Sequence, residues 1–404
     1  MNTVSCLRGG DDDDLPPIRV ISKSAYLERV AAESEAQAES QSPAELAARY
    51  AIWNRGLSLF KLAPADYTLN AARSDSADMV AAAYFPRKKD IVVIDHGEPM
   101  DDRAAFSLLA HEIVHAMQDR DYDLERFDEQ HAGSIDESLA SDAIVEGEAV
   151  HYQLMVSALL RGLPLDKLDW KAHYAQWRAD TFVDAEADPA PVARAQQRFP
   201  YPFGGGYVTQ YWLARGRAGI DQLFEQPPRT TSEIMFGTSF SELESAREQL
   251  HEHAIPILPE GYTVETGTSL GAWIARIYAA RQVADVAGRL AVASHLSADS
   301  FVVQRDAADD KVVASWRVRT SDEDAARAWP VLTPLTAASS EVQERDVLQV
   351  AAERIPAFLA ADLAWRAPVE SHDDDEQSGE ASVGWSASLR PRHRACVPLH
   401  AAAP

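Results

Sequence analysis

Apolar residues recur at intervals of three or four through much of the first half of the chain, and this spacing predicts amphipathic helices. In the clearest helix Phe106, Ile113 and Met117 share one face. Asp101 and Asp102 precede it as good N-caps, and their charge suits the positive end of the helix dipole. A second helix follows, and its buried stripe is formed by apolar residues: Leu139, Ala143, Val150 and Leu154. The pattern therefore predicts two helices that can bury their apolar faces.

Short runs of β-branched or alternating apolar residues interrupt this helical pattern. Residues 82–85 and 91–94 are predicted to form a hairpin, with Arg87–Lys89 at its turn. Further along, residues 301–304 and 312–318 alternate like paired strands, after a long amphipathic helix predicted over residues 270–290. Strands therefore flank the helices on both sides.

Together these elements predict an α+β fold. It has a mostly helical core with a small β-sheet or hairpin before the 106–117 helix, and a smaller C-terminal α+β part. The predicted divisions are an unstructured acidic leader over 1–24, a core domain over 25–255, the C-terminal region over 256–370 and a disordered tail over 371–404. The leader contains the like-charge block Asp11–Asp14, and the tail is acidic and then rich in Arg, Pro and Ala.

The first predicted helix carries a His-Glu-x-x-His motif made by His111, Glu112 and His115. Residues four apart lie on the same face of a helix, so both imidazoles can reach one metal ion. Zinc accepts nitrogen and oxygen ligands, and a catalytic zinc keeps one position open for water. Glu112 is placed to take a proton from that water as it attacks a carbonyl. The motif therefore predicts a site with one zinc ion.

A catalytic zinc needs a third protein ligand, and the second predicted helix offers one. Glu146 lies beside its buried stripe, where an uncompensated carboxylate would be costly. Glu148 is the second candidate, on a different face. Asp119, four residues after His115, and Asp142, four before Glu146, are equal candidates to orient a ligand imidazole.

The motif with the downstream Glu146-Gly147-x-Ala149 resembles the gluzincin class of zinc metallopeptidases, the thermolysin-like group. The Glu-Gly-x-Ala part resembles its aminopeptidase branch, in which the Glu is the third ligand. Longer stretches resemble a little-characterised set of bacterial proteins with the same motif: residues 115–124, 145–149 and 199–203. The chain departs from the thermolysin pattern at Val150, where that pattern has an acidic residue, and its His115–Glu146 spacing is longer than in the aminopeptidases.

The resemblance implies that residues 25–255 form a zincin-like metallopeptidase domain. It also implies zinc-dependent cleavage of a peptide or protein substrate, with Glu112 as general base. An oxyanion donor is needed, and Tyr201, Tyr207 and Tyr211 are candidates, with Tyr201 first because it lies in a bent Pro/Gly loop over 199–206. The strand beside the motif helix is expected to pair with extended substrate. The alternative is a zinc-stabilised, non-catalytic scaffold that binds peptides.

Net charge and targeting signals limit which partners and which locations the sequence indicates. The formal net charge of −25 argues against nucleic-acid binding. No run is long enough for a transmembrane segment. The sequence as it stands indicates a cytoplasmic location, because no signal peptide is present. If translation starts further upstream, residues 3–6 resemble the end of a lipoprotein cleavage box, and Cys6 would carry the lipid of a cell-envelope protein.

Overall fold

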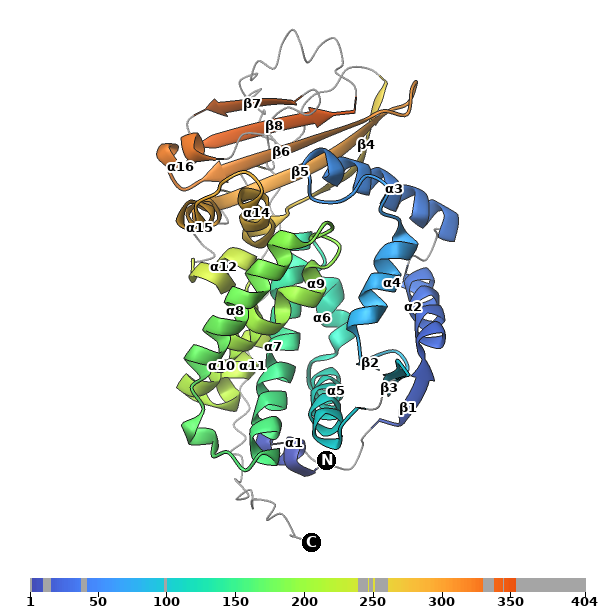
Figure 1. Cartoon of the computed structure of the whole chain (residues 1–404), viewed down its shortest axis with the longest axis vertical. Helices are drawn as coiled ribbons and strands as arrows, with labels where there is room; N and C mark the ends of the chain where they lie inside the picture. The colour runs from blue at the N-terminus through green and yellow to red at the C-terminus, as the bar shows by residue number, and fades with distance from the viewer. Residues whose placement is uncertain are drawn as a thin grey trace, which may run out of the picture.

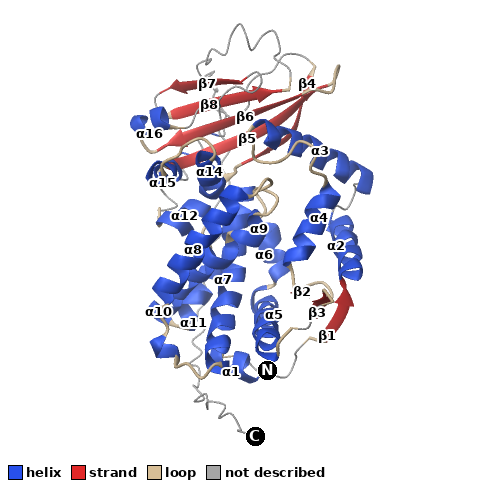
Figure 2. Ribbon diagram, viewed as in Figure 1, coloured by secondary structure: helices blue, strands red, loops and turns tan. Residues whose placement is uncertain are grey.

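Helices form most of the protein, and two small sheets accompany them. The computed structural model describes residues 2–9, 16–37, 42–97, 100–238, 246, 250, 261–329, 338–343 and 345–353. Its fold is α+β and mostly helical, as predicted, with a three-stranded and a five-stranded sheet (Figure 1). The larger sheet lies at one end of the molecule, and the smaller one lies beside α5 (Figure 2).

The N-terminal part supplies the smaller sheet and the helices around it. Its elements are α1 (Asn2–Arg8), β1 (Ile18–Ser22), α2 (Lys23–Gln37), α3 (Pro43–Leu59), α4 (Leu69–Met79), β2 (Ala82–Phe85) and β3 (Asp90–Asp95). The strand order is β1-β3-β2, so β2 lies at an edge. Strand β1 runs parallel to β3, and β2 runs antiparallel to it, with the predicted hairpin turn at Arg87–Lys89.

The central part is helical throughout. Its elements are α5 (Asp102–Tyr122), α6 (Leu124–Gln130), α7 (Ile135–Leu160), η1 (Leu165–Lys167), α8 (Trp170–Ala187), α9 (Ala195–Arg198), the π-helical turn η2 (Pro200–Gly204), α10 (Gly205–Arg215), α11 (Arg217–Glu225) and α12 (Thr231–Phe236). Helix α5 begins where predicted, because the Asp101 side chain accepts hydrogen bonds from two backbone N–H groups of the first turn. It ends at Asp123, which is in the left-handed conformation.

The C-terminal part is an antiparallel sheet with helices on it. Its elements are β4 (Tyr262–Thr268), α14 (Gly271–Ala280), α15 (Val286–Ser294), β5 (Leu296–Asp306), β6 (Val312–Thr320), α16 (Glu323–Ala328), β7 (Ala338–Gln343) and β8 (Asp346–Ala352). The strand order is β4-β5-β6-β8-β7. Strands β5 and β6 are the pair predicted from the alternating pattern.

Two large hydrophobic clusters hold these parts together. One extends from α3 through α7 and α14 to β5 and β6, so that Phe60, Phe301 and Trp316 pack edge to face. The other lies between α5 and α7 and includes Ile113 and Tyr152. The C-terminal sheet therefore shares its core with α3 and the first turns of α7, while the second cluster packs α5 against the rest of α7.

Backbone contact at glycine brings η2 against α7. A Cβ built on Gly147 would lie 2.5 Å from the backbone carbon of Gly204, and one built on Gly204 would lie 1.9 Å from the carbonyl oxygen of Ala143. Neither position leaves room for a side chain. The glycine of the Glu146-Gly147 pair thus lets the segment that carries Tyr201 lie directly on the helix that carries Glu146.

Three predictions about local structure were wrong. Residues 1–24 were expected to be unstructured, but they contain α1 and β1, which are fixed by partners far along the chain; Asp11–Asp14 and the tail over 371–404 lie outside the described residues. The bent loop over 199–206 is helical, because its prolines stand in the first turn of η2, where a missing N–H is harmless. The helix predicted over 270–290 is two helices, α14 and α15, broken at residues 281–285.

The glycine contact predicts the effect of Gly147→Ala. The added methyl would overlap the backbone of Gly204, so we expect the free energy of unfolding to fall by about 1–3 kcal/mol, the usual cost of overpacking. Denaturant unfolding monitored by circular dichroism measures this. Gly267→Ala is the control, because its Cβ would meet nothing closer than 3.6 Å. Equal stability of the two variants would contradict the close contact.

Candidate metal centre

Helices α5 and α7 bring His111, His115 and Glu146 together. The two imidazoles lie one turn apart on α5, and their Nε2 atoms are 3.0 Å from each other. The Glu146 carboxylate reaches across from α7, with Oε2 3.0 Å from Nε2 of His111 and 3.5 Å from Nε2 of His115. One potential ligand atom from each residue lies within 4.8 Å of the others. The structure therefore contains a possible metal-binding triad of the three predicted residues.

Hydrogen bonds on the far side of each imidazole orient the ring. Nδ1 of His115 lies 2.8 Å from Oε1 of Gln118, and Nδ1 of His111 lies 3.1 Å from Oε1 of Gln153. The orientation of the Gln118 amide is fixed, because its Nε2 donates to two acceptors, the Val145 carbonyl and the Glu148 carboxylate. Nδ1 of His115 must therefore be the donor, which leaves its Nε2 lone pair for a cation.

The short distances in the triad shift the pKa values of Glu146 and His115. Burial by itself would raise the pKa of Glu146, but the two imidazoles hold that pKa well below its ordinary value. Burial would lower the pKa of His115, yet the Glu146 and Glu112 carboxylates and the hydrogen bonds raise it to about 9. Without a metal ion, a proton on His115 therefore occupies the space between the acceptors.

Glu112 lies on α5 next to the triad and is 4% exposed. Burial raises the pKa of its carboxyl group, against the opposing effect of the two histidines. The backbone N–H of Tyr84, on strand β2, donates a hydrogen bond to it. This contact fixes Glu112 between the motif helix and the edge strand, and it leaves Glu112 outside the group of ligand atoms.

Tyr201 lies on the other side of His111. Its ring is stacked on the imidazole, with centroids 6.0 Å apart and planes 16° from parallel. Its O–H donates a hydrogen bond to Glu146. Burial, followed by the charges of Glu146 and Glu112, raises the pKa of this phenol well above 10, so it stays a donor at any physiological pH. Among the three predicted tyrosines, Tyr201 is the one in these contacts, whereas Tyr207 and Tyr211 face each other.

A cavity of about 230 Å³ opens beside Tyr201. Its walls come from α4, α8, α9 and η2. They combine apolar surface with polar groups: Met79, Trp177, Thr181, Asp184, Gln197, Arg198, Tyr201 and Pro202. The side chain that stacks on a triad histidine is thus also a wall of this cavity.

Other predicted participants lie elsewhere. Glu148, the second candidate ligand, points away from the triad and binds Gln118 and Arg8. Asp119 accepts hydrogen bonds from the Tyr84 hydroxyl and Lys89, and Asp142 from Gln196, so neither carboxylate orients a ligand imidazole.

The glutamines that do orient the imidazoles were missed from the sequence. Gln118 stands three residues after His115, on the same helix face, so its spacing was a usable signal. Gln153 belongs to α7, one helix away from His111, and no local pattern points to it.

Comparisons with known proteins identify no relative of this chain. The chain matches no protein-family model, no curated protein and no solved structure. Among the described helices, none has the length and apolar character that crossing a membrane requires.

The raised pKa of His115 predicts that metal binding depends on pH. A ligating imidazole must be neutral, so binding a divalent metal ion displaces the proton of His115. Affinity should therefore rise about tenfold per pH unit as the pH approaches about 9 and then level off. Calorimetric titration in two buffers with different ionisation enthalpies should show about one proton released at pH 7.5.

The same shift acts on stability in the opposite direction. In the metal-free protein the pKa of His115 is higher in the folded state than in the unfolded state. The stabilisation is therefore complete below pH 6.5 and is lost as the pH rises through about 9.

For the calorimetric titration, metal binding without proton release at pH 7.5 would contradict the assignment of His115 as a ligand.

Proposed function

We propose that this protein is a zinc-dependent metallopeptidase of gluzincin type. The observation that carries the proposal is the convergence of His111, His115 and Glu146, with Glu112 beside them. These residues come from two motifs on different helices. Their meeting in space is what a shared catalytic role requires.

The donor set suits zinc. Two imidazole nitrogens and one carboxylate oxygen are a common ligand set of catalytic zinc, and three protein ligands leave a fourth position open. The hydrogen bonds that the Oε1 atoms of Gln118 and Gln153 accept from the Nδ1 atoms keep both Nε2 atoms directed at the same point. Zinc held there would supply Lewis acidity, which lowers the pKa of water and polarises a carbonyl group.

The remaining side chains match the roles in peptide hydrolysis. Glu112 has a carboxylate whose raised pKa brings it closer to the pKa of the groups it would exchange protons with, as a general base requires. Tyr201 keeps its proton and can donate a hydrogen bond to the developing oxyanion. The cavity next to Tyr201 is suited to a side chain of the substrate.

The position of strand β2 favours a peptide as the substrate. It is an edge strand, and its Tyr84 N–H is directed at Glu112 on α5. An extended peptide laid along this edge would be bound through its backbone, close to the general base.

Glu112→Gln separates an enzyme from a metal-stabilised scaffold. The variant keeps the shape of the side chain and all three ligands, so we expect unchanged zinc affinity. Hydrolysis of a casein digest should fall by a factor on the order of a hundred or more. His111→Ala should lose zinc and activity together. Glu129→Gln, which alters an exposed glutamate of α6, is the matched control.

Two outcomes would decide against the enzyme. Full, chelator-sensitive hydrolysis by Glu112→Gln would remove this residue from the role of base. A wild-type protein that binds zinc and peptides but never cleaves them would establish the scaffold.

Tyr201→Phe tests the oxyanion donor. The ring stays stacked on His111 and only the O–H is lost, so kcat should fall about a hundredfold while KM changes little. Tyr207→Phe is the control, because this hydroxyl lies 3.4 Å from that of Tyr211, which is its hydrogen-bond partner. Steady-state kinetics on one peptide measures both variants, and an unchanged kcat in Tyr201→Phe would exclude the role.

A further inference from the structure

A chain of hydrogen bonds leads from the triad to the beginning of the described chain. His115 donates through Nδ1 to Gln118, and Gln118 donates through Nε2 to Oε2 of Glu148, over 2.9 Å. The Glu148 side chain is completely buried, although it carries a carboxylate. A buried carboxylate needs a charged partner, and this one finds it in α1.

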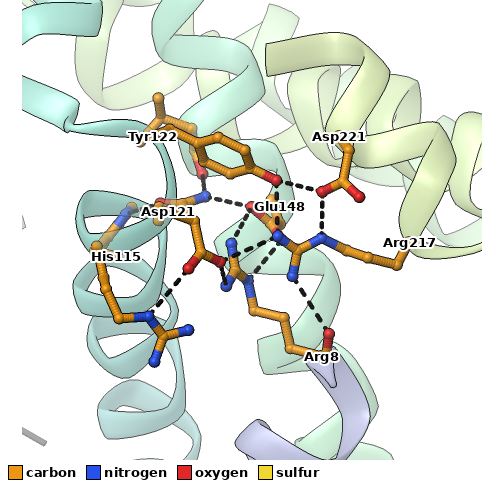
Figure 3. A network of polar contacts seen from close by, with 10 residues as sticks. Arg8, His115, Asp121, Tyr122, Glu148, Arg217 and Asp221 are labelled. Carbon is orange, nitrogen blue, oxygen red and sulfur yellow. Dashed lines mark hydrogen bonds and ion pairs between the residues drawn. The ribbon is translucent and has the colours of Figure 1, made fainter. Parts of the chain in front are cut away.

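That partner is Arg8, the last residue of α1. Its Nε donates to Oε1 of Glu148 over 2.8 Å, and its Nη2 lies 3.4 Å from Oε2. The Arg8 side chain is also completely buried, and its Nη1 donates to Asp121 of α5 over 2.6 Å. Figure 3 shows the guanidinium inserted among residues of α5, α7 and α11. A two-pronged contact of this kind fixes the plane of a carboxylate as well as its position.

Each contact in this series fixes the next group. Arg8 holds the Glu148 carboxylate, the carboxylate and the Val145 carbonyl hold the Gln118 amide, and the amide holds the His115 ring. Side chains that orient a ligand through the far nitrogen of its ring tune metal affinity by about 10- to 100-fold.

A neighbouring arginine belongs to the same cluster. Arg217 of α11 donates to Asp121, to the Tyr122 hydroxyl, to Asp221 and to the main-chain oxygen of Arg8 (Figure 3). These hydrogen bonds hold the outer part of the cluster and do not include the amide of Gln118. Because one of them is to the main-chain oxygen of Arg8, Arg217 also helps to hold the end of α1.

We propose that Arg8 is a positioning residue for the metal ligand His115, so that docking of α1 and metal binding are coupled. The inference rests on the proposed metal site but does not require turnover. Coupling is reciprocal: if docked α1 strengthens metal binding, bound metal must stabilise docked α1 by the same factor.

Zinc affinity of the full chain tests the first half. Arg8→Met should weaken zinc binding about tenfold, measured by competition with a chromophoric chelator at fixed pH. Arg8→Lys should recover part of the loss, because it restores the charge without the fork. Arg327→Gln is the matched control, because this exposed arginine of α16 also binds two carboxylates, Asp324 and Glu323; the variant should bind zinc within about twofold of the wild type. Circular dichroism of each zinc-free variant monitors folding.

A double variant tests whether Arg8 acts through Gln118. Gln118→Met removes the amide but keeps its bulk, and it should weaken zinc binding at least as much as Arg8→Met. If Arg8 works through this amide, the double variant should be no weaker than Gln118→Met alone. Additive losses would overturn the proposed route.

Hydrogen exchange of the α1 amides tests the reciprocal half. In the wild type, zinc should slow hydrogen exchange in α1 by the same factor that Arg8 contributes to zinc affinity. In Arg8→Lys, zinc should slow exchange only by the smaller factor that corresponds to the affinity which lysine restores. This arm also decides the matter if Arg8→Met does not fold. Unchanged zinc affinity in a folded Arg8 variant would overturn the inference and leave the metallopeptidase proposal standing. A wild type that binds no zinc would refute both.

Discussion

The structure depends most on three acceptors that face one another between α5 and α7. Two imidazole nitrogens and a carboxylate oxygen lie within 3.0 to 3.5 Å of one another; the two histidines are buried, and the Glu146 side chain is partly buried. Such an arrangement is unfavourable unless a cation or a proton lies between the acceptors. The hydrogen bonds between the Nδ1 atoms and Gln118 and Gln153 keep the Nε2 lone pairs of the two histidines directed at the carboxylate. The site therefore needs a positive charge.

The surrounding fold can be understood as the means of holding this arrangement. The apolar cluster between α5 and α7 fixes the separation of the helices, and the glycines at positions 147 and 204 let η2 lie directly on α7. Tyr201 is thereby stacked on His111. On the opposite side, Arg8 neutralises Glu148 and completes the support of His115. Interactions from α7, η2 and α1 thus converge on two adjacent turns of α5.

The parts of this arrangement that local sequence determines could be predicted. The i, i+4 spacing of His111 and His115 and most of the apolar stripes of α5 and α7 are properties of single helices, and they located the triad. Phe106, which was predicted on the stripe of α5, is exposed instead. The α+β class followed from the same periodicity. Tyr201 was named from its place in an unusual Pro/Gly segment, although that segment was wrongly expected to be a loop.

The parts that depend on distant contacts could not be predicted. Arg8 contacts Asp121 and Glu148, which lie 113 and 140 residues further along the chain. The sequence around Arg8 therefore gave no sign that α1 is fixed to the rest of the protein. The glycines at 204–206 were read as turn residues because glycine disfavours helices, whereas here they are needed for close packing. In each case a tertiary contact outweighed the local preference.

X-ray absorption at the zinc edge, on protein loaded with one equivalent of zinc, tests the central claim most directly. The account predicts four nitrogen or oxygen neighbours at about 2.0–2.2 Å, with the outer-shell signature of two imidazoles. In His115→Ala that signature should be reduced to one imidazole at most. Sulfur in the first shell, or a spectrum that His111→Ala and His115→Ala leave unchanged, would show that zinc binds elsewhere and that the three acceptors do not form a zinc site.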